Sequence, residues 1–266
     1  MRILALPLAA LLGLALPAQA QEEADAPSPN QIVDEAPREE WVAIPPENLL
    51  VMTLAPATDG AERRVVIQLM PEPFSQGWVA NIRTLARAEW YDGITVNRVQ
   101  DNYVVQWGDP NYDNPEADGA AKPLPEGLEV MGEAEYTAPS FVPPASSLKR
   151  ELQGSATMSG LIAAGVNVDA LMAEPEPTQT SEARRALADR YSQFAAFTQG
   201  WPIGGRAEEF WPVHCYGMVG VGRGMSPDTG SGAELYTVIG HAPRHLDRNI
   251  ALVGRIVDGM EHLSSL

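Results

Sequence analysis

The chain has 266 residues, of which 45% are hydrophobic and 20% charged, and its formal net charge at pH 7 is −17. This charge excludes nucleic acid and anionic membrane surfaces as expected partners, because both repel a strongly acidic protein. The single cysteine, Cys215, rules out an intramolecular disulfide, so a packed core must supply the stability, and the length suffices for one.

The N-terminus has the pattern of a secretory signal peptide. One positive charge at Arg2 precedes a short apolar run from Ile3 to Leu16, and small residues follow up to Ala20. A membrane-spanning helix needs about 20 apolar residues, which neither this run nor any later one provides. We therefore expect a signal peptide over residues 1–20, cleavage after Ala20, and a periplasmic or secreted protein. Without Arg2 the mature net charge is 17 − 35 = −18.

An acidic arm and a hairpin are expected next. Residues 21–48 are acidic and proline-bearing with few apolar anchors, which predicts a flexible arm. Leu49 to Ala55 and Arg63 to Met70 are apolar, β-favouring runs. Because Asp59-Gly60 lies between them, these runs predict an antiparallel hairpin.

The segment from Phe74 to Arg87 changes to a helical period. Its apolar residues recur on one helical face: Trp78, Val79, Ile82, Leu85 and Ala86. Ser75 is the expected N-cap, since a short hydroxyl side chain suits that position.

Two further strands are predicted between Tyr91 and Pro110, with a polar turn at residues 100–102. Arg98 lies inside this apolar run. A guanidinium on a buried sheet is costly unless its donors are satisfied, which suggests a functional role. A strand-edge arginine with its head in water is the alternative, and this stretch alone does not decide between them.

Residues 111–210 form a long, poorly patterned region. We expect an exposed loop from Asn111 to Leu128 and a strand from Leu128 to Ala138. An amphipathic helix is predicted from Thr180 to Gly200, packed on the outside of the domain. Trp201 to Pro212 is predicted to be a turn-rich bridge.

The C-terminal part returns to short elements. Strands are expected from Leu235 to Ile239 and from Ile250 to Ile256, with a tight turn or 3₁₀ segment at Pro243 to Asp247. A terminal helix is expected from Val257 to Leu266. Many short strands with two capping helices predict an all-β protein built as a closed barrel.

Two apparent site signatures are weak. His241 and His245 are spaced i, i+4 as in a helical metal site, but Pro243 disfavours a helix there and no third ligand is apparent, so no metal is expected. Cys215 beside His214 resembles a thiol nucleophile, but an apolar-flanked cysteine is more often a small buried hydrophobe.

Two blocks of the sequence together resemble cyclophilin-type peptidyl-prolyl isomerases. The first comprises Tyr-Asp-Gly at 91–93, Arg-Val at 98–99, and aromatic-x-x-Gln-x-Gly-Asp-Pro at 103–110. The second, from Gly217 to Leu263, is similar to the latter half of the family. The resemblance covers roughly half of the chain and implies a closed eight-stranded antiparallel barrel with a helix over each end. Residues 49–266 would form this domain, interrupted by a partly helical insertion at about 111–210.

The resemblance also implies a site. Arg98 would be the catalytic guanidinium and Gln106 the neighbouring amide that orients it. The other positions carried over are the proline-pocket wall, Tyr103, Val104, Tyr236 and Leu246, and the peptide-facing backbone of Gly222 and Arg223.

Four positions depart from the family pattern. Glu234 stands where glutamine is usual, Tyr236 where phenylalanine is usual, His245 where tryptophan often stands, and Ile250 where histidine often stands. A tyrosine hydroxyl and a carboxylate are expected to make the site more polar. Weaker turnover or a different substrate preference would follow.

The resemblance implies a cofactor-free peptidyl-prolyl cis-trans isomerase that assists the folding of exported proteins, acting as a monomer on proline-containing peptides and unfolded chains. One alternative is a binding module that grips proline-containing clients as a chaperone with little catalysis. Another is a structural envelope protein whose long insertion is the working part.

Overall fold

A computed structural model describes residues 27–112, 117–139, 189–192, 194–206 and 209–266. The predicted signal peptide and the first part of the helix expected from Thr180 lie outside these residues. The chain divides into two compact units, Met1–Ala43 and Ile44–Leu266. Among the described residues, no helix is long and apolar enough to cross a membrane.

The described part of the first unit contains a short helix, α1 (Pro29–Glu35), and a 3₁₀ turn, η1 (Arg38–Glu40). Ser28 and Gln31 form a capping box, each side chain accepting from the other's backbone N–H, which explains why α1 begins here. Neither element buries a residue. The acidic segment thus has local helical order that its composition did not predict.

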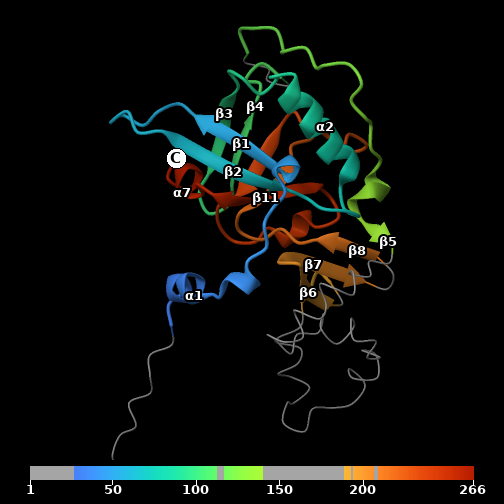
Figure 1. Cartoon of the computed structure of the whole chain (residues 1–266). Coiled ribbons are helices and arrows are strands. Elements are labelled where there is room, and N and C mark those ends of the chain that lie inside the picture. Colours follow the sequence, from blue (N-terminus) through green and yellow to red (C-terminus); the bar gives the residue numbers. More distant parts are fainter. Residues whose placement is uncertain (1–26, 113–116, 140–188, 193, 207–208) are drawn as a thin grey trace, which may run out of the picture. The chain divides into compact units, whose positions relative to one another are not determined.

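A curled, seven-stranded antiparallel sheet dominates the second unit, in the order β1-β2-β11-β9-β10-β4-β3 (Figure 1). Its strands are β1 (Leu49–Leu54), β2 (Arg63–Leu69), β3 (Thr95–Gln100), β4 (Val104–Gly108), β9 (Met218–Val221), β10 (Leu235–Val238) and β11 (Leu252–Asp258). The turn η2 (Pro46–Asn48) leads into β1. The predicted hairpin is confirmed, since Leu49 pairs with Gln68 and Leu54 with Arg63.

Helix α2 (Gln76–Arg87) supplies much of the core. Its predicted apolar face is buried, and Trp78, Val79 and Ile82 pack with Val65 and Leu235 inside the sheet. The prediction that the Ser75 hydroxyl caps the helix is wrong, although Ser75 does occupy the N-cap position. Ser75 is the N-cap residue, but it has a left-handed backbone (φ 56°), and its side chain makes no capping hydrogen bond.

A closed eight-stranded barrel is not confirmed. In the described residues β1 and β3 are the two edges of the sheet and do not pair with each other. A groove of about 710 Å³ lies between them, lined by side chains of both strands and by Trp107.

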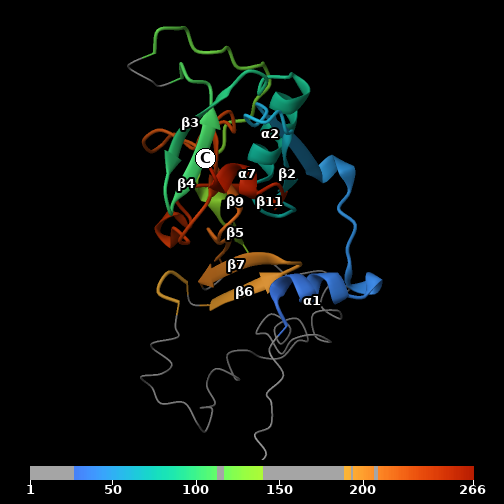
Figure 2. The same cartoon turned by 90° about the vertical axis from the view of Figure 1, so that its left-hand side faces the viewer.

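A second, four-stranded sheet has the order β5-β8-β7-β6. Its strands are β5 (Ala138–Pro139), β6 (Phe194–Thr198), β7 (Trp201–Arg206) and β8 (Glu209–Pro212). Figure 2 shows β6 and β7 below β9 and β11 of the larger sheet. Buried Trp201 and Ile203 join the main core, which ties the two sheets together.

This second sheet corrects three predictions. The helix expected up to Gly200 is wrong at Phe194–Thr198, which is a strand, and the turn-rich bridge over 201–212 is β7 and β8. Gln199 and Gly200 both have positive φ (51° and 75°), as in a two-residue hairpin turn, so Gly200 closes a hairpin rather than a helix. The strand expected from Leu128 to Ala138 is instead the 3₁₀ turn η3 (Glu133–Tyr136) followed by β5.

The C-terminal elements agree with expectation apart from their bounds. The predicted 3₁₀ segment is η4 (Arg244–Leu246). Strand β11 continues to Asp258, so the terminal helix α7 spans only Glu261–Ser264. Its buried Leu263 packs into the core inside the large sheet.

Candidate active site

Strand register brings the central predicted residues into one row. Arg98 on β3 lies opposite Gln106 on β4, Gln106 lies opposite Tyr236 on β10, and Tyr236 lies opposite Gly220 on β9. Directly opposed residues place their side chains on the same face of a sheet. The alternate residues on β4 and β10 point into the core: Val105, Trp107 and Leu235. The row therefore stands on the outer face.

A β-bulge aligns Arg98 with this row. The register shifts between Val96 and Arg98, so that Val96 faces Trp107 and Arg98 faces Gln106. Bulges commonly re-aim a side chain in this way. Arg98 is exposed, donates from Nη2 to Gln100 Oε1 at 2.6 Å, and has its guanidinium carbon 5.7 Å from the centre of the Tyr103 ring. The guanidinium therefore avoids the cost of burial, as the edge-strand alternative anticipated.

Gln106 is held by Glu234. Its Nε2 donates to Glu234 Oε2 at 2.6 Å, whereas Arg98 donates to Gln100, so the expected orientation of Arg98 by Gln106 is not formed. A cavity of about 410 Å³ opens beside this pair. Its walls include the predicted residues Arg98, Gln106, Gly222, Arg223 and Glu234.

The peptide-facing backbone expected at Gly222 is partly occupied. The Gly222 N–H donates to the Glu234 carbonyl oxygen at 2.8 Å. A Cβ at Gly222 would lie 2.9 Å from Glu234 Cβ, so glycine permits this close approach. Arg223 is anchored by Nε and Nη2 bonds to the backbone and side-chain oxygens of Asn249 at 3.1 and 2.7 Å.

The predicted pocket wall forms an apolar cluster next to the polar pair. Val104, Tyr236 and Val238 are buried together, and Tyr103, Leu246 and Ile250 pack against them. The exposed His245 stacks on Tyr103, with ring centres 6.2 Å apart and planes 12° from parallel. Two distant blocks of the sequence thus meet here.

The Tyr236 hydroxyl points into the protein, which corrects the expectation that it makes the site more polar. Tyr236 is 4% exposed, and its hydroxyl lies 2.7 Å from Nε2 of the fully buried His214. Burial raises the pKa of Tyr236 well above its ordinary value, so the side chain remains a phenol. A Cβ at Gly220 would lie 2.3 Å from Tyr236 Cζ, so the ring rests directly on the Gly220 backbone.

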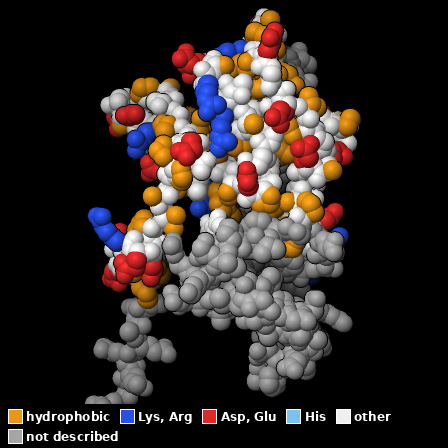
Figure 3. Space-filling view, turned by 45° about the vertical axis from the view of Figure 1, so that its right-hand side comes forward, with side chains coloured by type: hydrophobic (Ala, Val, Ile, Leu, Met, Phe, Trp, Pro, Cys, Tyr) orange, Lys and Arg blue, Asp and Glu red, His pale blue; other side chains and the backbone are white. Residues whose placement is uncertain are grey.

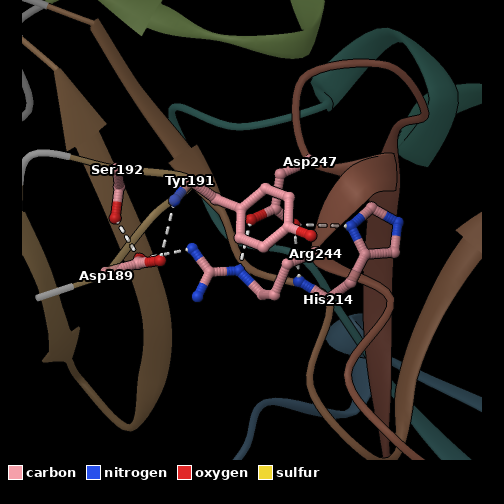
Figure 4. A network of polar contacts seen from close by, with 6 residues as sticks. All are labelled: Asp189, Tyr191, Ser192, His214, Arg244 and Asp247. Atoms are coloured by element: carbon pink, nitrogen blue, oxygen red, sulfur yellow. Dashed lines mark hydrogen bonds and ion pairs between the residues drawn. The ribbon is translucent and has the colours of Figure 1, made fainter. Parts of the chain in front are cut away.

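Asp247 is the centre of a buried polar network that sequence reasoning did not find (Figure 4). Its Oδ1 accepts from the His214 backbone N–H at 3.0 Å and lies 2.9 Å from His214 Nδ1. Its Oδ2 accepts from Arg244 Nε at 2.6 Å, and Arg244 Nη2 donates to Asp189 Oδ2 at 2.6 Å. The Tyr191 ring packs beside the Arg244 guanidinium, whose carbon lies 5.5 Å from the ring centre.

The network sets the protonation of its members. Burial opposes charge on Asp247, but hydrogen bonds from His214 and Arg244 lower its pKa below the ordinary value. Burial lowers the pKa of His214 despite the neighbouring carboxylate. A neutral imidazole beside an ionised carboxylate donates from Nδ1 and accepts at Nε2, so the Tyr236 hydroxyl donates to His214.

Cys215 is poorly placed to act as a thiol nucleophile. Burial raises the pKa of the Cys215 thiol, and the neighbouring His214 ring faces Asp247 and Tyr236, so the arrangement does not favour a thiolate nucleophile. Figure 3 shows acidic and basic side chains interspersed over the described part of one face.

A curled antiparallel sheet of seven strands, with an exposed guanidinium and an apolar cluster on its outer face, defines a half-barrel class of β protein. Within this class, residues 56–266 match the model of the family described as cyclophilin type peptidyl-prolyl cis-trans isomerase/CLD. The chain belongs to the cyclophilin-type peptidyl-prolyl cis-trans isomerase family.

A solved structure supports the fold. The chain is similar to cyclophilin AquaCyp293 from Hirschia baltica, with 22% sequence identity and a TM-score of 0.53, over 91% of this chain and 74% of that one. No curated protein matches the sequence.

Proposed function

We propose that this protein catalyses cis–trans isomerisation of X–Pro bonds in exported polypeptides. Membership in the family supports the reaction. The observation that carries the choice of site is the cross-strand row, which sets the exposed Arg98 guanidinium two strands from the apolar wall at Tyr236. The proposed export rests on the signal-like residues 1–20.

The chemistry requires binding rather than a nucleophile. An X–Pro bond rotates over a barrier of about 18–20 kcal/mol, because the nitrogen lone pair is delocalised into the carbonyl. A catalyst must bind the twisted amide better than either planar isomer. Twisting localises the lone pair on nitrogen, so a donor placed there stabilises only the transition state.

Arg98 is the proposed donor. Its guanidinium would donate toward the proline nitrogen and the preceding carbonyl oxygen, while the cluster around Tyr103, Tyr236 and Leu246 holds the pyrrolidine ring. Charge-assisted donors in a preorganised site stabilise developing charge strongly. Because Arg98 now donates to Gln100, the peptide would replace that exposed bond.

Substituting Arg98 tests this assignment. We expect Arg98→Ala to lower kcat/KM by about 10²–10³-fold in a proline-isomerisation assay on a short peptide, as for other lost transition-state donors. Arg64→Ala is the matched control, since Arg64 makes an exposed ion pair with Asp258 on the β2–β11 side. Unchanged turnover in Arg98→Ala would remove this residue from the mechanism.

A proline-binding chaperone module is the second candidate. The observation that favours it is that Gln106 donates to Glu234 and Arg98 donates to Gln100, so the expected bond between Gln106 and Arg98 is not formed. The two functions separate by NMR of a labelled Ala-Pro peptide. Exchange cross-peaks between cis and trans forms at substoichiometric protein support the isomerase, and binding shifts without exchange support the module.

A further inference from the structure

We infer that His214 and Asp247 are positioning residues for the proline pocket. His214 fixes the ring of Tyr236 through its hydroxyl, and Asp247 fixes the η4 turn that carries His245 and Leu246. The inference rests on the proposed function and deepens it, because it assigns the geometry of the pocket to residues that do not touch the substrate.

The Tyr236 side of the pocket is held at two points. The Gly220 backbone supports the ring from one side, and the hydroxyl at the far end donates to His214 Nε2 at 2.7 Å. The His214 ring is itself nearly parallel to the Tyr236 ring, at 10°. His214 has 0% exposure, so the Tyr236 hydroxyl finds its acceptor inside the protein and not in bulk water.

The η4 side is held by Asp247, the residue that ends the turn. Its side chain is 2% exposed and receives the His214 backbone N–H, the His214 ring and the Arg244 guanidinium. His214 follows β8, so the smaller sheet is linked through one carboxylate to the turn that presents Leu246. Arg244 extends the link to Asp189, which also accepts from Ser192.

The network of His214 and Asp247 should affect binding of the substrate more than rotation about its X–Pro bond. The pyrrolidine ring occupies the apolar wall in the planar and the twisted states alike, so a misplaced wall weakens both equally. Uniform loss of binding raises KM and leaves kcat unchanged, whereas loss of the Arg98 donor lowers kcat. Positioning by His214 therefore has a kinetic signature distinct from a defect in catalysis.

A pair of substitutions separates the two bonds of His214. In His214→Asn the amide nitrogen falls near the position of Nδ1 and keeps the bond to Asp247 but does not reach Tyr236. In His214→Gln the amide falls near the position of Nε2 and keeps the bond to Tyr236. We expect His214→Asn to raise KM about tenfold at unchanged kcat, as for one lost buried hydrogen bond. His214→Gln should stay within about twofold of the wild type, because Asp247 keeps two other donors, the backbone N–H of residue 214 and Arg244 Nε.

A second variant keeps the test decisive if the position-214 variants do not fold. Tyr236→Phe retains the ring and removes only the hydroxyl, so it should raise KM like His214→Asn. In the Tyr236→Phe background His214→Asn should add little, because the bond is already absent. Equal KM values for the Asn and Gln variants, or additive effects in the double variant, would overturn the inference.

A measurement of peptide binding alone can show whether the positioning role of His214 and Asp247 fails or whether the proposed isomerase function fails. The probe is a short Ala-Pro peptide titrated into the full chain and followed by NMR. A wild-type chain that binds it without exchange overturns the isomerase proposal, and the ratio of Kd values among the variants still tests the positioning role. A wild-type chain that neither binds nor isomerises the peptide overturns both.

Discussion

The Nε2 atom of His214 lies 2.7 Å from the hydroxyl oxygen of Tyr236, which belongs to the apolar cluster of the candidate site. One buried contact thus joins the strand that forms the pocket wall to the segment leaving the second sheet. Its strength depends on His214 remaining neutral, since only the neutral ring accepts at Nε2.

The first prediction concerns pH. Burial holds the pKa of folded His214 below its ordinary value of 6.5. Below pH 6.5 the unfolded chain binds a proton that the folded chain does not, so stability falls on acidification until the folded pKa is reached. The groups facing His214 are Asp247, Arg244 and His245 from η4 and Tyr236 from β10. The Asp247 pKa is lowered, so its contribution is lost only below 3.8.

Urea unfolding at pH 7.5 and pH 5.5 measures this effect. The wild-type midpoint should be lower at the acidic pH, and His214→Gln should remove most of the difference, because glutamine does not titrate. His262→Gln is the control for a partly exposed histidine near the C-terminus. An equal pH difference in the wild type and His214→Gln would show that other groups dominate.

A second prediction concerns Gly220. A Cβ at this position would lie within 2.3 Å of the Tyr236 ring, on a strand that cannot easily move. Gly220→Ala should therefore destabilise the fold by about 1–3 kcal/mol through overpacking. Gly132→Ala is the matched control, because nothing lies within 4 Å of its would-be Cβ. Equal unfolding midpoints for the two variants would contradict the packing seen here.

A third prediction concerns the pair Gln106 and Glu234. The carboxylate makes this hydrogen bond charge-assisted, and such bonds are roughly twice as strong as neutral ones. Glu234→Gln keeps an acceptor for Gln106 Nε2 but weakens the bond, so the Gln106 side chain can rotate and its Oε1 can accept from the Arg98 guanidinium. We expect kcat/KM for a short proline peptide to rise by up to about fivefold. A fall in kcat/KM would mean that the carboxylate itself aids the reaction.

Local patterns in the sequence predicted local structure well. The hairpin of β1 and β2, the helix α2 and the pair β3 and β4 follow from alternation, turn residues and helical period. The second sheet was missed for a physical reason. Gly200 suits a helix C-terminus and a hairpin turn equally, and only pairing between β6 and β7 decides which one forms.

The site was predictable only in part. Arg98, Gln106 and Tyr236 came from resemblance to a family, and their alignment depends on a bulge at residue 97 and on register between strands. His214 was first considered as a neighbour of Cys215. Its partners lie 22 and 33 residues away along the chain, and no spacing pattern marks such contacts. The segments before and after His214 also lack a clear helical or strand pattern in the sequence, so nothing local indicated its role.

The last prediction concerns Arg244. Its guanidinium neutralises Asp247, whose side chain is 2% exposed, and binds Asp189 on the other side. Removing Arg244 leaves a buried carboxylate without a positively charged partner, although His214 still donates to it, and this costs more than one neutral hydrogen bond contributes. Arg244→Met, which keeps the stem, should destabilise the fold by about 1–3 kcal/mol. It should also loosen η4, so that KM rises in parallel.

Exposed Arg87, in the last turn of α2, provides the control for this experiment. Arg87→Met should leave both the urea midpoint and KM unchanged, because it removes a charge without uncovering a buried partner. If Arg244→Met were as stable as the control, the charge on Asp247 would be sufficiently satisfied by His214 alone. A stability loss without a change in KM would instead show that Arg244 stabilises the fold without affecting substrate binding. Leu246 would then be positioned by packing in the apolar cluster.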